Sequence, residues 1–261
     1  MNQVKKAKTF AELHVKGTPL VLYNAWDAGS AKSILKAGAK AIATSSWSVA
    51  SSQGYNDGED LPIEIAEMIV GRIAASVDVP VSVDFEGGYS EDDGKLAENI
   101  LRFLDLGVIG INFEDRIVKG SGLYEINRQA QRIAAIRKAA EQMGVDLFIN
   151  ARTDVFFVDG DTDESVNAAL ERGKAYAAAG ASGLFVPGLA DDSRIGRVAK
   201  AASLPINIMV MDGVPPNHRL SELGVSRISY GPIPYSQTLG MLQAEAKKAL
   251  HETSTAEHRR H

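Results

Sequence analysis

Short apolar runs alternate with longer amphipathic segments along almost the whole chain. The apolar runs are rich in valine and isoleucine, which is typical of strands buried on both faces of a parallel sheet. The runs predicted to be strands are 19–24, 41–44, 79–84, 109–113, 146–151, 183–186, 205–210 and 227–230. The predicted helices that follow them are 28–36, 62–76, 95–106, 128–143, 164–179, 193–202, a short turn at 221–223, and 235–250.

Residues that start or stop helices mark several of these boundaries. Asp27 is placed to cap the helix over 28–36, and Pro62 opens the next one. Gly107 and Gly180 follow the ends of two later helices, where a left-handed residue is common. Eight strand–helix units in 261 residues, with no linker between them, predict a (β/α)8 TIM barrel rather than an open doubly wound sheet. We expect a single domain over residues 1–250 and a polar C-terminal tail at 251–261.

Polar side chains cluster where the second to fifth predicted strands end, and barrel enzymes carry their active sites at this end. Asp84 and Glu86 close the third strand on alternate positions, so their carboxylates should point to the same side, about 7 Å apart. Glu114 follows the fourth strand and Arg152 the fifth. Carboxylates that face one way suit Mg²⁺, which takes few protein carboxylates and keeps several waters. This pattern predicts a metal site near these residues.

Composition and charge narrow the class of protein further. The chain is 45% hydrophobic with a net charge of -5, which does not suggest a surface that binds nucleic acid. The absence of cysteine excludes disulfides, thiolate metal sites and a cysteine nucleophile. No apolar run approaches the roughly 20 residues that span a bilayer, so no membrane partner is expected. The first residues lack an apolar signal core, and we expect a cytoplasmic protein.

Five motifs at successive strand ends resemble the isocitrate lyase/phosphoenolpyruvate mutase superfamily, in its phosphoenolpyruvate mutase-like branch. They are Asn24-Ala25-Trp26-Asp27-Ala28-Gly29-Ser30, Thr44-Ser45-Ser46-Trp47, Asp84-Phe85-Glu86-Gly87-Gly88-Tyr89, Asn112-Phe113-Glu114-Asp115 and Asn150-Ala151-Arg152-Thr153-Asp154. The resemblance covers roughly residues 8–250. It implies an Mg²⁺-dependent lyase that acts on a small α-oxo carboxylate through an enolate, whose charge the metal offsets.

The resemblance also implies roles for individual residues. Asp84 would bind Mg²⁺, or Mn²⁺ in its place, while Glu86 and Glu114 would hold the waters of the ion. The family usually has aspartate where Glu86 stands. The implied substrate-binding residues are Ser45, Ser46, Trp47, Asn150 and Arg152, and the implied catalytic residues are Lys119, Arg152 and Asp57.

Simpler interpretations stand beside these roles. Ser45 and Ser46 could satisfy the backbone at a strand end, and Asp57 could be a solvated turn acid. Arg152 could form a structural ion pair with Asp154 or Glu114.

The segment 116–124 corresponds to the gating loop of the family, and its sequence bears on the reaction. The lyases carry a catalytic cysteine in this loop, which is missing here, so ordinary isocitrate or 2-methylisocitrate cleavage is disfavoured. Lys119 matches a lysine of the mutase loop, but Ser121 stands where the mutase has asparagine. An oxaloacetate decarboxylase-like reaction or another carbon–carbon cleavage is therefore favoured, with a phosphonopyruvate or phosphoenolpyruvate phosphomutase or hydrolase as the alternative.

Two further classes remain open, together with the state of assembly. A Schiff-base aldolase would need a lysine at a strand end, and the predicted strands offer none. A non-catalytic carboxylate-binding barrel would keep the metal site without turnover. The resemblance implies a homo-oligomer, a dimer or tetramer, in which the last helix packs on a neighbouring subunit. The connection Pro232-Ile233-Pro234 before that helix would permit such an exchange.

Overall fold

Eight parallel strands form one barrel sheet in a computed structural model that describes residues 2–257, and the side chains of residues 2–251. The strands are β1 (Leu20–Leu22), β2 (Ile42–Ala43), β3 (Val81–Asp84), β4 (Gly110–Glu114), β5 (Phe148–Arg152), β6 (Gly183–Phe185), β7 (Ile206–Met209) and β8 (Arg227–Ser229). They pair in the order β1-β8-β7-β6-β5-β4-β3-β2. A parallel bridge between Ala25 and Thr44 links the two outer strands. The predicted (β/α)8 barrel is confirmed.

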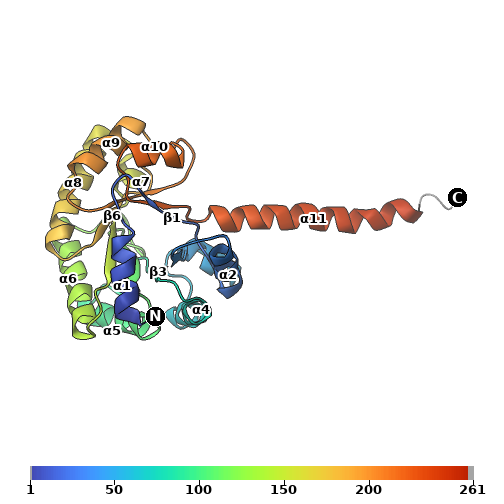
Figure 1. The fold of residues 1–261 in the computed structure, drawn as a ribbon, viewed down its shortest axis with the longest axis horizontal. Helices are drawn as coiled ribbons and strands as arrows, with labels where there is room; N and C mark the ends of the chain where they lie inside the picture. Colours follow the sequence, from blue (N-terminus) through green and yellow to red (C-terminus); the bar gives the residue numbers. More distant parts are fainter. Residues whose placement is uncertain (1, 258–261) are drawn as a thin grey trace.

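Helices surround the sheet, as Figure 1 shows. They are α1 (Gln3–Glu12), α2 (Ala28–Lys36), α3 (Ser46–Ser52), α4 (Ile63–Ser76), α5 (Asp93–Asp105), α6 (Ile126–Gln142), α7 (Val155–Asp159), α8 (Asp163–Ala178), α9 (Asp192–Ala201), α10 (Asn217–Glu222) and α11 (Ile233–Glu257). The predicted stop signals act as expected, since Gly107 and Gly180 adopt φ values of 88° and 100°. Asp27 forms a reciprocal capping box with Ser30, whose backbone N–H lies 2.6 Å from the Asp27 carboxylate.

Three helices were not predicted. The helix α3 lies in the segment expected to be a polar loop, and α7 follows β5 directly. Both are short, and short helices leave little periodic signal in a sequence. The helix α1 buries only Ala7 and Phe10, so its apolar face is too narrow to stand out. Tertiary contacts rather than local pattern specify these three elements.

The helix α1 closes the N-terminal end of the barrel. Phe10 is fully buried and meets the ring of Phe148 on β5 at 5.4 Å, edge to face. His14 stacks on the same ring at a centroid distance of 4.0 Å. Gly110 on β4 leaves room for this plug, because a Cβ at that position would lie 2.9 Å from the Phe10 ring. Solvent therefore reaches the barrel interior only from the opposite end.

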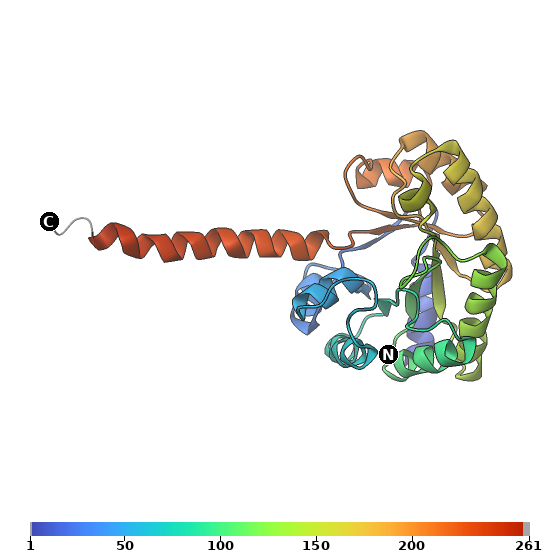
Figure 2. The same cartoon turned by 180° about the vertical axis from the view of Figure 1, so that it is seen from behind.

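The helix α11 projects away from the barrel as a single long rod (Figures 1 and 2). It continues to Glu257, past the predicted end at Leu250, and residues 258–261 of the predicted tail lie outside the described residues. Leu239, Met241 and Leu242 on this helix are exposed. Among the described residues, no helix is long and apolar enough to cross a membrane.

The aromatic plug leads to a test of stability. Phe10→Ala should lower the free energy of unfolding by about 3–5 kcal/mol, because it leaves a cavity in a site that the strands cannot close. Val4→Ala on the same helix is the matched control, since Val4 is 57% exposed and should change stability by less than about 0.5 kcal/mol. Urea unfolding followed by circular dichroism measures both. Equal effects of the two substitutions would show that α1 does not close the barrel.

Candidate active site

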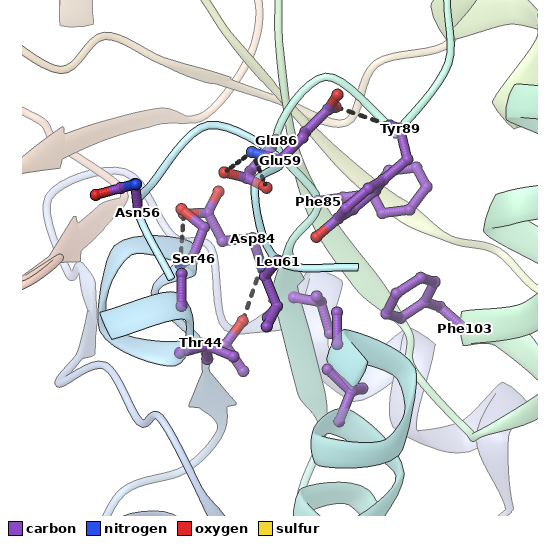
Figure 3. Close-up of a pocket in the computed structure, with 15 residues that line it drawn as sticks. Thr44, Ser46, Asn56, Glu59, Leu61, Asp84, Phe85, Glu86, Tyr89 and Phe103 are labelled. Carbon is purple, nitrogen blue, oxygen red and sulfur yellow. Dashed lines mark hydrogen bonds between the residues drawn. The ribbon is translucent and has the colours of Figure 1, made fainter. Parts of the chain in front are cut away.

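Asp84 lies at the carboxyl end of β3, held by the start of α3. Its Oδ2 atom accepts hydrogen bonds from the backbone N–H of Ser46 at 3.1 Å and from the Ser46 hydroxyl at 2.9 Å (Figure 3). The backbone N–H of Asp84 donates to the Thr44 hydroxyl oxygen at 2.9 Å. The second carboxylate oxygen, Oδ1, is buried and has no hydrogen-bond partner among the described residues. A buried anionic oxygen without a donor is costly, so it marks a position for a cation or water.

Glu86, two residues after Asp84, has an unusual backbone conformation. Its φ is 50°, in the left-handed region that non-glycine residues rarely adopt. Its Oε1 accepts hydrogen bonds from the backbone N–H groups of Gly58 and Glu59, at 3.0 and 3.1 Å. Burial, and then the charges of Asp84 and Asp57, raise the pKa of Glu86 to about 8. Asp84 and Glu86 line one cavity, although the strand ends at Asp84 and the alternation of side chains expected from the sequence does not extend to Glu86.

Glu114 and Arg152 form a buried ion pair beside this cavity. The Arg152 Nη1 lies 3.0 Å from Glu114 Oε2, and its Nε lies 2.6 Å from Asp154 Oδ1. Burial raises the pKa of Glu114 to about 8, although the charge of Arg152 acts in the opposite direction. Burial disfavours the guanidinium, but Glu114 and Asp154 raise the pKa of Arg152 above its ordinary value. The ion pairs foreseen for Arg152 are therefore present, at the edge of the acidic cluster.

The turn that contains Asp57 borders the same cluster. The Ser46 hydroxyl lies 3.1 Å from Asp57 Oδ1 and 2.9 Å from Asp84 Oδ2, and its single proton serves one of them at a time. Partial burial and the charge of Asp84 raise the pKa of Asp57. Asp57 thus lies at the mouth of the site.

The other residues expected to bind substrate occupy different positions. Ser45 is buried and caps α3, where its hydroxyl accepts from the Ser48 backbone N–H at 3.4 Å. Trp47 is 37% exposed and meets the ring of Tyr235 edge to face. Asn150 lies inside the barrel and donates to Asn112 at 2.9 Å, so it is one layer beneath the acids.

The segment 116–124 lies against the loop after β3 that carries Glu86, which we call the acidic loop. Arg116 and Leu123 form an antiparallel bridge that shapes it into a narrow turn. Val118 packs on Gly87, where a Cβ would lie only 2.8 Å from the valine side chain. Lys119 is exposed at the tip, and it lines a cavity of about 250 Å³ together with Glu59. The segment therefore covers one side of the site, as expected of the gating loop.

Sequence reasoning missed three residues that hold the site together. Arg132 on α6 is buried and donates to the backbone carbonyls of Gly87 and Ser90 in the loop that carries Glu86. Gln129, one turn earlier, donates to the Glu114 carbonyl at 2.9 Å. Glu59 accepts from the Tyr89 backbone N–H at 2.7 Å. The signal that could have found the first two is a pair of polar residues on the buried face of an amphipathic helix.

Asp115 stabilises the fold and does not belong to the acidic cluster of Asp84, Glu86 and Glu114. It is fully buried and turned away from Glu114, with Arg172 at 3.1 Å and the Tyr176 hydroxyl at 2.8 Å. These donors hold the end of β4 against α8. Of the acidic pair at that strand end, only Glu114 faces the site.

The residues present fit a hard cation that is held mainly through water. Among the described residues, no three histidine, aspartate or glutamate side chains converge as a complete ligand set. The free Oδ1 of Asp84 would supply one direct oxygen, and Glu86 and Glu114 would hold waters of the ion. Mg²⁺ binds in this way, with one or two carboxylates and several waters.

Comparisons with known proteins place the chain in a family. The profile described as phosphoenolpyruvate phosphomutase matches residues 10–250. The chain is 34% identical to an uncharacterized protein of Mycobacterium tuberculosis strain H37Rv, over 88% of this chain and 84% of that protein. It is 26% identical to the 2-methylisocitrate lyase of Escherichia coli K12, over 91% and 81% of the two chains. The chain therefore belongs to the isocitrate lyase/phosphoenolpyruvate mutase superfamily, as its motifs indicated.

Solved structures agree with this assignment. A candidate phosphonomutase of Burkholderia cenocepacia J2315 superposes with a TM-score of 0.92 and 44% identity, over 95% of this chain and all of the other. A phosphonopyruvate hydrolase in complex with oxalate and Mg²⁺ superposes with a TM-score of 0.84 at 19% identity, over 97% and 88% of the chains. The second likeness shows the common fold.

The raised pKa values of Glu86 and Glu114 give a pH prediction. Both carboxyls ionise near pH 4.5 when unfolded and near pH 8 when folded, so the unfolded state releases protons first. Their contribution makes the metal-free protein less stable as pH rises from about 4.5 to 8. Thermal unfolding in EDTA should show this decline, and Glu114→Gln should flatten it. A wild-type profile no steeper than that of the variant would contradict the assignment.

Proposed function

We propose that this protein is an Mg²⁺-dependent lyase that acts on a small α-oxo carboxylate through an enolate. The observation that carries the proposal is the buried, donor-free Oδ1 of Asp84, a residue that lines one cavity with Glu86 and whose charge also acts on Glu114. When bound there, the ion would offset the negative charge that grows on the enolate oxygen. The oxalate and Mg²⁺ bound by the phosphonopyruvate hydrolase support the same pairing of ligand and metal.

The chain's own residues would bind and orient the substrate. Arg152 is held as a planar fork by Asp154, with Nε at 2.6 Å and Nη2 at 2.9 Å from its two oxygens. A guanidinium fixed in this way can present its remaining N–H groups to a carboxylate. Ser46, at the start of α3, lines the same cavity as Asp84, so its hydroxyl would contact the substrate. Lys119 and Asp57 would complete the mouth of the site.

The sequence of the loop over the site limits which bond of the substrate can break. The segment 116–124 has no cysteine, so protonation by a thiol, as in the lyases of the family, is not available. Release of CO₂ from an oxaloacetate-like substrate needs only that the enolate be stabilised and then protonated by water, whereas another carbon–carbon cleavage would also need a base to take the proton of a hydroxyl group. A phosphonopyruvate or phosphoenolpyruvate phosphomutase or hydrolase is the second candidate, because the candidate phosphonomutase at 44% identity favours it. A barrel that binds carboxylates without turnover is the third.

Nuclear magnetic resonance with a small substrate panel distinguishes these candidates. Oxaloacetate, phosphonopyruvate, phosphoenolpyruvate and 2-methylisocitrate would be followed by proton and phosphorus spectra with Mg²⁺ and with EDTA. Metal-dependent pyruvate from oxaloacetate, above the spontaneous rate, supports the lyase. A new phosphorus resonance supports the mutase or hydrolase. Tight oxalate binding without turnover of any compound would support the non-catalytic barrel.

Asp84→Asn gives the direct test of the metal site. Loss of the carboxylate should lower kcat/KM by at least about 100-fold, because the amide keeps the shape and removes the charge that binds the ion. Asp105→Asn, an exposed acid at the end of α5, is the matched control and should leave activity unchanged. Full activity of the Asp84 variant would refute the metal assignment.

The protein is proposed to assemble with copies of itself through α11. In a (β/α)8 barrel the last helix normally covers the wall beside the first strand, but here it points away (Figure 2). The wall it leaves open is a groove of about 690 Å³ along β1 and α2, where Val21 is 41% exposed. The strands of parallel sheets are covered on both faces, so a second copy's α11 is the expected occupant.

Charged substitutions on α11 test this assembly. Leu239 and Leu242 are three residues apart on one face of the helix, and both are exposed. Replacing both with glutamate should convert an oligomer to a monomer, because it places two charges in an apolar contact. Gln243→Glu is the control, which adds one such charge at a neighbouring polar position. Sedimentation velocity gives the masses, and a monomeric wild-type protein would contradict the proposal.

A further inference from the structure

A layer of polar side chains fills the barrel directly beneath the acidic site. Arg227 on β8 extends across the interior, where its Nη2 donates to Asn112 on β4 at 3.1 Å and its Nε to Ser229 at 3.4 Å. Asn207 on β7 accepts from the Ser229 hydroxyl at 3.1 Å. Arg227 is 1% exposed, and its whole side chain is enclosed. A TIM-barrel interior is usually packed with branched apolar residues, so a charged group at this position needs an explanation.

The guanidinium of Arg227 has only neutral partners. No ion pair involves it among the described residues, and its Nη1 has no hydrogen-bond partner. On the side of the plug, the ring of Phe10, which is uncharged, lies 6.0 Å from the guanidinium carbon. His14, in the same plug, is also kept neutral: burial, followed by the charge of Arg227, lowers its pKa to about 3. A buried cation is stable only if an opposite charge is near.

The negative charge lies above, in the acidic site. Asn112, the partner of Arg227, is the register neighbour of Asp84 on the adjoining strand. Neighbouring strands are about 4.8 Å apart, so Asn112 connects the guanidinium to the strand that carries Asp84. Burial lowers the pKa of Arg227 to about 9, and the charge of Asp84 is the interaction that opposes this shift. The charge of Asp84 is therefore the negative charge that acts on Arg227.

We propose that Arg227 is a fixed counter-charge of Asp84, which stabilises that carboxylate before a cation binds and lowers the affinity of the site for the cation. The inference rests on the proposed metal site. Arg227 touches neither the ion nor the substrate in this arrangement and acts as a positioning residue. Its positive charge repels a divalent cation at Asp84 but attracts the anionic ligand that binds above the cation.

This arrangement predicts two opposite changes in one variant. Arg227→Gln removes the charge and keeps a hydrogen-bond donor for Asn112. Binding of Mn²⁺ or Mg²⁺ to the metal-free protein should tighten by about tenfold, the order expected for a charge repelled across a partly buried distance. Binding of oxalate to the Mg²⁺-saturated protein should weaken by about threefold, because the same charge is lost from beneath an anion. A merely structural defect would weaken both.

Isothermal titration of both ligands, with circular dichroism to confirm folding, makes the measurement. Arg137→Gln is the matched control, because Arg137 is another largely buried arginine with partners in the Gly180 and Leu147 carbonyls, away from the site. It should leave both affinities unchanged. Cation binding that is unchanged or weaker in the Arg227 variant would overturn the inference.

A second variant tests the same inference about Arg227 if Arg227→Gln does not fold. Asn112→Asp keeps the shape of the side chain and can still accept from Asn150 and Arg227. Its carboxylate neutralises the guanidinium, so cation binding should again tighten, and unchanged binding would overturn the inference. A wild-type protein that binds no divalent cation would instead refute the proposed function itself, which separates the two failures.

Discussion

The burial of carboxylates at the mouth of the barrel is the constraint on which the rest of the site depends. Asp84, Glu86 and Glu114 come from two strand ends, and the charges of Asp84 and Glu86 both act on Glu114. Their charges are offset by directed donors: the N–H of Ser46 for Asp84, and the N–H groups of the turn at Gly58 for Glu86. Since burial outweighs these donors for both glutamates, their pKa values rise to about 8. The protein thus stores an unfavourable arrangement of charge that a cation relieves.

The backbone around the acids adopts conformations that direct these N–H groups toward the carboxylates. Glu59, Glu86 and Tyr89 all adopt positive φ values, of 57°, 50° and 59°. Each such residue costs free energy, and three in one loop cluster persist only where the surrounding structure fixes them. Arg132 does this by donating to the carbonyls of Gly87 and Ser90 while its guanidinium stacks on the rings of Phe113 and Tyr124. The acidic loop is therefore rigid because a buried arginine on a neighbouring helix holds it.

The two ends and the wall of the barrel differ in what covers them. The N-terminal end is closed by an aromatic plug from α1, so charges inside the barrel are shielded from solvent on that side. The carboxyl end remains open to a ligand and is partly covered by the segment 116–124. On the wall, the groove beside β1 stays uncovered because α11 points outward. Closure of the interior is thus achieved within one chain, whereas coverage of the wall is proposed to need a second copy.

The sequence by itself determined the barrel and the composition of its acidic site. The alternation of apolar runs and amphipathic segments is a local property, and Asp84, Glu86, Glu114 and Arg152 follow directly from the strand ends at which they stand. The short helix α3, which is capped by Ser45, leaves little periodic signal in the sequence and depends on contacts with neighbouring elements. Only the tertiary structure decided which polar residues meet across the barrel. Arg227 and Asn112 are 115 residues apart in sequence, and no local pattern encodes a contact between side chains that face each other only when the sheet closes.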